Sequence, residues 1–425
     1  MTTIDPRSFL RDLFDAAVRA ADPLTAIAQH LPAMPKGRTV VVGAGKASAQ
    51  MAAAIERVWP AAIEGLVVTR YGFGVRCRNI EIIEAGHPVP DAAGITGARR
   101  LLQAVSGLTE DDLVIALISG GGSALLPAPA GALTLADEIA VNEVLLASGA
   151  PIGVMNTIRK HISTIKGGRL AAAAYPARVV SFVISDIPGD DPALVASGPT
   201  VPGAGSRNDA ISAIKLYNMQ LPDAIMTHLL SPEAESLRPD EPLFRRNEVH
   251  VVASASLSLE AAAQAAKCHG IDAAILSDSI EGESADVASV HAAIAREISM
   301  RDRPFAKPVV LLSGGETTVT VRGSGKGGRN SEFLLSLAIE LGGLEGVYAL
   351  AADTDGVDGT EDNAGAFVDP GSIDRMRIAG FDPRAMLRNN DAWSAFNGIG
   401  DLFVTGPTGT NVNDLRAILI SNLST

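Results

Sequence analysis

Positive charge, cysteine and aromatic residues are all scarce in this sequence. The 425 residues include 35 Lys and Arg against 48 Asp and Glu, which gives a formal net charge of −13. A general nucleic-acid-binding surface needs a basic face, so we expect no nucleic-acid partner. The two cysteines, Cys77 and Cys268, form no CxxC pattern, which favours a reduced, cytoplasmic protein. Aromatic residues make up only 4% of the chain, which favours tightly packed helices on sheets over an aromatic-rich binding surface.

Long apolar runs are missing as well. No run reaches the ~18 residues that a membrane span requires, so we expect no membrane partner. The N-terminal segment has the pattern of a helix rather than of a signal peptide. Asp5 is suited to capping this helix, Pro6 to its first turn, and the apolar residues between Phe9 and Phe14 recur at helical spacing.

A repeated unit of apolar strand, glycine-rich break and helical pattern dominates the chain. Continuous Val/Ile/Leu strands that alternate with helices predict an α/β fold with two α/β/α domains and largely parallel sheets, the first Rossmann-like. A segment rich in proline and charge, starting at Ser236, interrupts the pattern. We therefore predict a Rossmann-like α/β domain over residues 1–240. A second α/β domain over residues 241–425 would carry the GGE, GKGGRN and DTDG loops.

The first strand-to-helix turn reads "VVVGAGKAS". Gly45 and Lys46 lie where a helix N-terminus favours an anion, although a solvated lysine beside a packing turn would give the same pattern. The turn is only partly similar to a dinucleotide fingerprint, because Ser48 takes the third glycine position. Arg70 also stands where a dehydrogenase has an acidic residue, which at most suggests NADP.

A second turn, "LISGGGSALLPAP", places Gly120, Gly121, Gly122 and Ser123 after another strand. Their backbone N–H groups are suited to an anion nest. A close contact between helix and sheet would also demand glycine here.

Charged residues follow in two further segments of the N-terminal half. "NTIRKHISTIKGGRLA" concentrates basic residues, of which Arg159 and Lys166 are candidates for anion contacts, unless they form a solvated face. "ISDIPGDDP" places Asp186 at a strand end and Asp190 in the loop, where carboxylates suit Mg²⁺ or proton transfer from a hydroxyl. Helix-capping aspartates would be the alternative.

The C-terminal half carries the densest pattern, "SGGETTVTVRGSGKGGRNSE". We expect Gly314, Gly315 and Glu316 to form one turn and Lys326, Arg329 and Asn330 to lie at or near a helix N-terminus, a favourable anion site.

An acidic loop, "ALAADTDGVDG", follows a later strand. Asp353 and Asp355 are candidates for holding Mg²⁺, although a solvated acidic loop remains the alternative.

Together, "GAGKA", "GHPVPD", "LISGGGSALLPAP", "NTIRKHIS", "SDIPGDD", "GKGGRNSE", "DTDG" and "TGPTGTNVND" resemble the class II glycerate kinases, whose members once carried the name hydroxypyruvate reductase. These motifs span Val40 to Asp414 in one order. The resemblance implies phosphorylation of D-glycerate by ATP with Mg²⁺, at the 2-hydroxyl to give 2-phosphoglycerate and ADP, in a cleft between two α/β domains. Lys46 and Arg329 match the lysine and arginine that matter most for catalysis in that family.

The remaining roles follow from chemistry. Lys46 and Arg329 suit the transferring phosphoryl group or the glycerate carboxylate. Asp186 suits orienting or deprotonating the hydroxyl, with Asp190 second, and Glu316, Asp353 and Asp355 are candidates near metal and nucleotide. Two alternatives stay open: an NAD(P)H-dependent hydroxypyruvate reductase and a non-catalytic regulator that binds a sugar acid or nucleotide. A homodimer is also left open.

Overall fold

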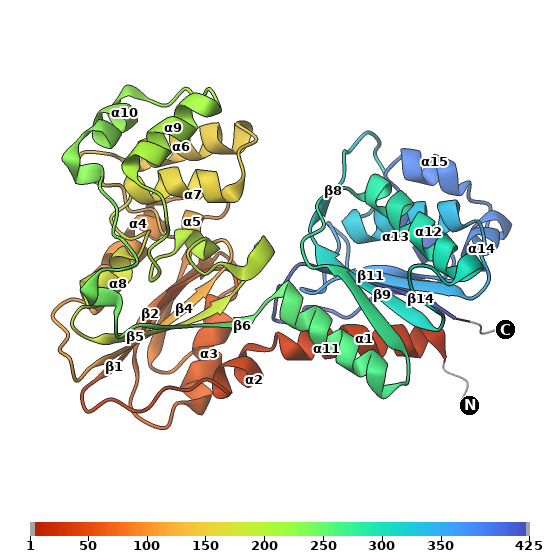
Figure 1. Cartoon of the computed structure of the whole chain (residues 1–425), viewed down its shortest axis with the longest axis horizontal. Coiled ribbons are helices and arrows are strands. Elements are labelled where there is room, and N and C mark those ends of the chain that lie inside the picture. The colour runs from red at the N-terminus through yellow and green to blue at the C-terminus, as the bar shows by residue number, and fades with distance from the viewer. Residues whose placement is uncertain (1–4, 422–425) are drawn as a thin grey trace. The chain divides into compact units, whose positions relative to one another are not determined.

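The computed structural model describes residues 5–421 (Figure 1). The chain divides into two compact units: one comprises Pro23–Val252, and the other joins the segment ending at Asp22 to the chain from Ala253 onward. This division differs from the predicted boundary at residue 240 in two respects. Strand β6 (Glu248–Ala253) still belongs to the first sheet, and helix α1 (Pro6–Ala20) packs in the core of the second unit.

The unit of Pro23–Val252 contains a six-stranded sheet in the order β3-β2-β1-β4-β5-β6. The pairs from β3 through β5 are all parallel, as the sequence predicted. This strand order is that of the Rossmann fold, and it reverses between β1 and β4. The bounds of its other strands are β1 (Thr39–Ala44), β2 (Glu64–Arg70), β3 (Ile80–Ala85), β4 (Leu113–Ser119) and β5 (Arg178–Ile184).

The helices of this unit form two groups. The helices of one group lie beside the sheet: α2 (Pro23–Ala28), α3 (Ser48–Val58), α4 (Ala92–Ala104), α5 (Gly122–Leu125) and α8 (Arg169–Ala174). The other forms a small bundle with an apolar core of its own, seen at the top of Figure 1: α6 (Leu135–Ala147), α7 (Ile152–His161), α9 (Arg207–Leu216) and α10 (Asp223–Leu230). Single 3₁₀ turns complete the unit at η1 (Pro188–Asp190), η2 (Val195–Ser197), η3 (Pro232–Ala234) and η4 (Pro242–Phe244).

The second unit has a mixed sheet in the order β13-β12-β11-β14-β9-β7. Only β7 and β9 pair in parallel, whereas β14 is antiparallel to both of its neighbours and β12 to both of its own. The prediction of a largely parallel sheet is therefore wrong for this unit. The bounds are β7 (Asp272–Ser277), β9 (Val309–Gly315), β11 (Val347–Asp353), β12 (Gly365–Val368), β13 (Leu402–Phe403) and β14 (Asp414–Ile420), with a separate two-stranded ladder of β8 (Gly282–Glu283) and β10 (Thr317–Thr318).

The sequence did not reveal the direction of β14, because all seven residues of this strand are buried. A run that is buried on both faces is typical of a parallel strand, but it carries no information about direction.

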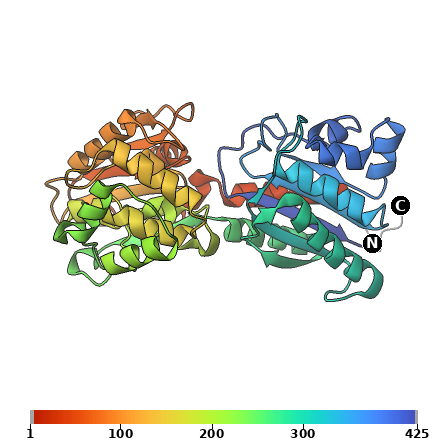
Figure 2. The same ribbon diagram turned by 90° about the horizontal axis from the view of Figure 1, so that it is seen from above.

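Helices cover both faces of the mixed sheet (Figures 1 and 2). Alternate residues of β9 show this: Val310 and Leu312 pack with α1 and α11 (Ala255–Cys268), and Val309 and Leu311 pack with α12 (Ser284–Arg301) and α13 (Arg329–Leu341). The short helices are α14 (Ser372–Ile378), α15 (Pro383–Arg388) and α16 (Ala392–Asn397). Within residues 5–421, no helix has the length and apolar character needed to cross a membrane.

Candidate active site

The predicted residues of the first unit gather at the carboxyl edge of its parallel sheet. Lys46 follows β1, Gly120 to Ser123 follow β4, and Asp186 follows β5. The strand order reverses between β1 and β4, and ligands of open parallel sheets bind at such a point. The sheet topology therefore supports a ligand site at these loops.

Backbone contacts hold Lys46 in place. Its N–H donates to the Gly120 carbonyl at 2.8 Å, and its own carbonyl accepts from the Thr69 hydroxyl at 3.3 Å. The next amide, that of Ala47, donates to Ser119 Oγ at 3.0 Å. The Lys46 side chain is half-buried and has no carboxylate partner among the described residues. The backbone of Lys46 is therefore held in place at the sheet edge, and no carboxylate of residues 5–421 pairs with its side chain.

At each glycine of the Gly120–Gly122 loop, a Cβ would lie too close to a neighbouring atom. A Cβ on Gly120 would lie 1.6 Å from Asp186 Oδ2, and one on Gly122 would lie 2.5 Å from the Ala196 methyl. Gly121 has φ +80°, and a Cβ there would lie 2.9 Å from His87 Nε2 and 3.1 Å from Lys46 Cγ. The loop is thus a packing turn, but the atoms that pack on it are those of the candidate site. A role for its N–H groups as an anion nest stays a prediction.

His87 is a member of this group that the sequence did not single out, although it lies in the quoted "GHPVPD". It follows β3 and approaches Gly121. Burial lowers the pKa of its imidazole to about 4, and the positive charges of Lys46 and Arg70 act in the same direction. The ring is therefore a neutral hydrogen-bonding group near pH 7.

We expect the His87 ring to titrate with a midpoint about 4 instead of the ordinary value near 6.5. Because the folded chain favours the neutral ring, this group costs stability as the pH falls from about 6.5 towards 4. An NMR titration of ring-labelled histidine measures the midpoint, with the His87→Gln spectrum assigning the resonance. A midpoint near 6.5 would show that the ring is solvated.

A chain of polar contacts connects Ser123 to Arg159. Ser123 Oγ lies 2.6 Å from Ser197 Oγ, which donates to Asn156 Oδ1 at 2.9 Å. Arg159 donates to the same oxygen at 3.0 Å and to Asn142 Oδ1 at 2.9 Å. Burial lowers the pKa of the Arg159 guanidinium, and the charge of Glu138 opposes this. Among the described residues Arg159 has no ion pair, which suits its predicted contact with an anion.

Lys166 is placed differently from the prediction. Its ammonium group makes a short ion pair with Glu138, and both side chains are almost completely buried. The second oxygen of Glu138 accepts from the Ala128 amide at 3.1 Å. The pair joins the turn before α8 to α6, so the positive charge of Lys166 is neutralised inside the protein.

Replacing Lys166 by methionine is expected to lower the free energy of unfolding by about 3–5 kcal/mol, because Glu138 would be left buried without its counter-charge. Urea denaturation measures this loss, and adding Glu138→Gln should restore part of it. The exposed pair of Arg301 and Glu297 supplies the control, since Arg301→Met should cost about 1 kcal/mol or less. Unchanged stability with a raised KM for ATP would instead support the predicted anion contact.

The two aspartates after β5 differ in their surroundings. Asp186 is half-buried against Gly120. Asp190 is half-buried as well, but it ends the single turn η1 with φ +53° between the exposed Gly189 and Asp191. Because Asp186 lies nearer the end of β5 and packs against Gly120, it is the better placed of the two to meet a ligand at the sheet edge.

The second unit is organised around Arg329, the first residue of α13. Its Nε donates to Asp414 at 2.9 Å, Nη1 to Glu316 at 2.7 Å and Nη2 to Asp353 at 2.6 Å. The Asp414 and Asp353 side chains are buried, whereas that of Glu316 is 56% exposed. Burial alone would lower the pKa of Arg329, but these three carboxylates outweigh it and raise the pKa. Glu316 is the partner that an incoming anion would displace most readily.

Asp358 occupies the N-terminus of α13. Its carboxylate accepts from the amides of Asn330 at 2.9 Å and Ser331 at 2.8 Å. A Cβ on Gly328 would lie 2.3 Å from Asp358 Oδ1, which explains one glycine of the GKGGRN motif. The predicted anion site at this helix end is therefore filled by the protein's own carboxylate. Asn330 is fully buried and donates to Asp414 at 2.8 Å, so it is a support for that aspartate.

The other predicted residues of this half have local roles. Lys326 is exposed, pairs with Glu361 at 3.3 Å and lies over the Trp393 ring. Gly314 and Gly315 end β9, and a Cβ on Gly315 would meet the Ile280 amide at 2.3 Å. These glycines permit a close approach of two backbone segments.

Asp353 is the last residue of β11, and Asp355 lies two residues after it. Burial and the negative charges of Asp414 and Asp355 raise the pKa of Asp353 well above its ordinary range, although Arg329 opposes them. Asp355 accepts from the Val357 amide at 2.9 Å. No group of three or more His, Cys, Asp or Glu residues suited to a metal ion exists within residues 5–421. Two carboxylates fit Mg²⁺, which usually keeps waters and binds substrate phosphates, better than an ion that needs a protein cage.

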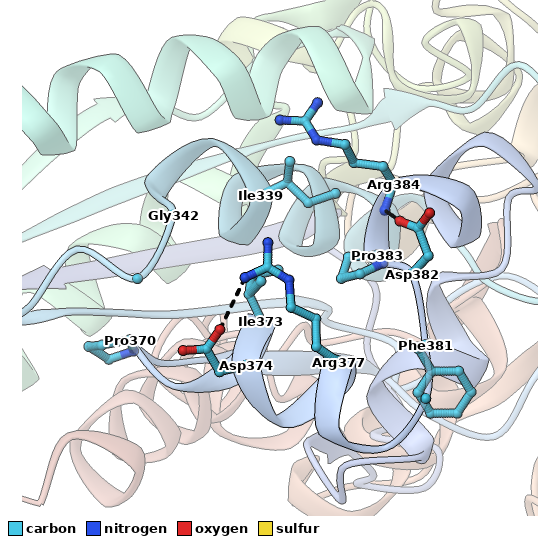
Figure 3. Close-up of a pocket in the computed structure, with 12 residues that line it drawn as sticks. Ile339, Gly342, Pro370, Ile373, Asp374, Arg377, Phe381, Asp382, Pro383 and Arg384 are labelled. Atoms are coloured by element: carbon cyan, nitrogen blue, oxygen red, sulfur yellow. Dashed lines mark hydrogen bonds and ion pairs between the residues drawn. The ribbon is translucent and has the colours of Figure 1, made fainter.

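A cavity of about 890 Å³ lies beside Arg329, lined among others by Glu316, Gly327, Gly328 and Glu332. A smaller cavity of about 480 Å³ in the same unit lies between the end of α13 and the turn from α14 to α15 (Figure 3). There Arg377 pairs with Asp374 at 3.1 Å, and none of the predicted residues is among the described residues that line it. The cavity beside Arg329 is the one associated with the site.

Asp414 and Arg416, on β14, were not predicted as site residues. Asp414 closed the last quoted motif, but its role was not recognised. The sequence signal that could have identified them is the presence of an acidic and a basic residue in an otherwise apolar run, "DLRAILI".

Known proteins match the chain along nearly its whole length. Residues 9–230 match the family described as a domain of unknown function, DUF4147, and residues 309–414 match the MOFRL family. A protein of Agrobacterium vitis with the provisional name hydroxypyruvate reductase is 54% identical over 426 residues, 98% of this chain and 95% of that protein. The D-glycerate 2-kinase of Thermotoga maritima is 39% identical over 421 residues, 98% of this chain and 99% of that enzyme. A crystal structure of glycerate kinase from Thermotoga maritima has a TM-score of 0.88 at 39% identity and covers 98% of this chain and 100% of that chain.

Proposed function

This chain belongs to the DUF4147–MOFRL family that includes these glycerate kinases, and from that premise we propose that it transfers the γ-phosphoryl group of ATP to D-glycerate. The products would be ADP and 2-phosphoglycerate. The similarity to a D-glycerate 2-kinase over 98% of the chain carries the proposal, because it spans both units.

The positive charges suit phosphoryl transfer, which depends on positioning and on charge stabilisation. Within residues 5–421, Lys46 has no carboxylate partner at the switch point of the parallel sheet, and Nη1 of Arg329 bonds to the exposed Glu316. We assign both to the transferring phosphoryl group or to the glycerate carboxylate. Arg159, with no carboxylate partner among the described residues, is a further anion contact.

Asp186 is our candidate for the group that receives the proton. The 2-hydroxyl oxygen attacks the γ-phosphorus, the bond from that phosphorus to the ADP oxygen breaks, and the hydroxyl proton passes to the Asp186 carboxylate. Its position after β5, half-buried against Gly120 at the carboxyl edge of the sheet, supports this role.

Asp353 and Asp355 would hold Mg²⁺ together with the phosphates of ATP. When bound, the ion neutralises charge on the phosphate oxygens. Arg329 keeps Asp353 in place through Nη2 at 2.6 Å, so the carboxylate that would hold the metal is also a partner of the arginine.

The decisive experiment incubates the full-length protein with ATP, MgCl₂ and D-glycerate and resolves the products by phosphorus NMR. We expect 2-phosphoglycerate and ADP, with Lys46→Met as a control that forms them far more slowly. Formation of 3-phosphoglycerate would correct the position of transfer. Binding of ATP without any phosphorylated product would overturn the proposal and favour a non-catalytic binding protein.

A reductase is the second candidate, favoured by the provisional name of the Agrobacterium vitis relative. The end of β2 argues against NAD as its cofactor, because Arg70 stands there, with its guanidinium 3.5 Å from the centre of the Phe73 ring, where NAD-dependent enzymes have an acidic residue for the ribose. Supplying hydroxypyruvate with NADH or NADPH tests it directly. Sustained loss of the cofactor's ultraviolet absorbance would replace the kinase assignment.

A further inference from the structure

A buried ion pair on β14 has no role in the reaction described above. Arg416 Nη2 lies 2.7 Å from Asp414 Oδ2, and both side chains are completely buried. Two desolvated charges in the middle of a sheet are costly unless their hydrogen bonds are well satisfied. Such a pair therefore needs an explanation from its contacts.

The register of the sheet brings three acidic residues to one edge. Asp414 lies opposite Asp353 of β11 on one side and opposite Gly315 of β9 on the other. Glu316 is the residue directly after Gly315. Arg329 bonds to all three of these carboxylates from the start of α13.

Asp414 holds one edge of the Arg329 guanidinium. Nε of Arg329 donates to Oδ1 at 2.9 Å and to Oδ2 at 3.0 Å. Because the guanidinium is planar and rigid, fixing its Nε edge sets the direction of Nη1 and Nη2. These two nitrogens donate to Glu316, which lines the cavity, and to Asp353, which is a candidate metal ligand.

Arg416 in turn holds Asp414. Its other bonds go to the Gly314 carbonyl and to Thr317 Oγ1, each at 3.2 Å, so it fixes the carboxylate relative to the end of β9. Its charge also offsets the repulsion between Asp414 and Asp353. We propose that Arg416 is a positioning residue that orients Arg329 through Asp414. The inference rests on the proposed phosphoryl transfer.

Arg416→Lys tests this role because it keeps the charge and removes the fork. We expect kcat to fall about 10- to 100-fold, since a small misplacement of a catalytic group can cost that much, while the thermal midpoint changes little. KM for D-glycerate should stay within about twofold, because the Arg416 side chain is completely buried. Wild-type kcat in Arg416→Lys would overturn the proposal.

A double-mutant cycle separates positioning from a general structural effect. If Arg416 acts through Arg329, adding Arg416→Lys to Arg329→Lys should cause no further loss of kcat. Losses that multiply would show that Arg416 acts by another route. The product assay of the wild-type protein is the reference for this cycle. If the wild type forms product and the two losses of kcat multiply, only this inference is overturned. If the wild type forms no product, the proposed function is overturned as well.

Two further variants guard against a folding artefact. Thr317→Val removes one partner of Arg416 without changing any charge, and it should lower kcat less than Arg416→Lys does, again with no effect in the Arg329→Lys background. If Arg416→Lys fails to fold, Thr317→Val becomes the test, and a wild-type kcat in that variant would contradict the proposal. Arg375→Lys is the matched control, because Arg375 also binds two carboxylates, Asp369 and Asp401, outside the site. Its kcat should be that of the wild type.

Discussion

Replacing Arg329 by alanine is expected to lower kcat ~10³-fold or more, the effect known for arginines that stabilise a phosphoryl-transfer transition state. Its Nε and Nη2 are committed to the buried carboxylates of Asp414 and Asp353, whereas Nη1 meets the exposed Glu316. The transition state therefore gains a forked donor whose direction is already fixed. Steady-state rates with ATP, Mg²⁺ and D-glycerate measure the loss.

Arg329→Lys refines this prediction, since it keeps a positive charge among the three carboxylates. We expect a smaller loss than for alanine, because an ammonium group cannot bond to two partners and an anion in one plane. Thermal denaturation of each variant checks that the fold persists, and Arg375→Ala controls for loss of a paired arginine. A folded Arg329→Ala variant with near-wild-type kcat would remove Arg329 from the mechanism.

Lys46→Met is expected to lower kcat about 10²–10³-fold, the usual effect of removing one preorganised electrostatic group from a transition state. The Lys46 side chain has no carboxylate partner among residues 5–421, so its charge is available to a phosphoryl group or a carboxylate. Methionine has a similar length and fills the space beside Gly121. The fold should therefore be preserved while the charge is lost.

Lys215→Met supplies the matched control, because Lys215 is an exposed lysine on α9 of the same unit. Its kcat and KM should equal those of the wild type. Were Lys46→Met to raise KM for ATP or D-glycerate at unchanged kcat, Lys46 would bind the ground state and the transition state equally.

Local pattern was enough to find the strands and the loops of the site. Apolar runs that end in glycine predicted β1, β4 and β9, and the residues after them include Lys46 and Glu316. Local pattern could not assign the partners of these charges. Lys166 and Arg159 lie in one basic segment, yet Lys166 is neutralised by Glu138 and Arg159 is not. That difference depends on which helix packs against each side chain.

The α/β class, the Rossmann-like first sheet and the family could be predicted from the order of residues, because strand periodicity and glycine-rich turns are local and ordered along the chain. The tertiary structure was needed to show that β14 enters the second sheet antiparallel between β9 and β11. It thereby brings Asp414 and Arg416 to Arg329, more than eighty residues earlier in the chain. It also fills the N-terminus of α13 with Asp358 and gives the Gly120–Gly122 loop its neighbours Asp186 and His87. The physical reason is that charge pairing, burial and close packing act between segments distant in sequence, and no local pattern records which segments meet.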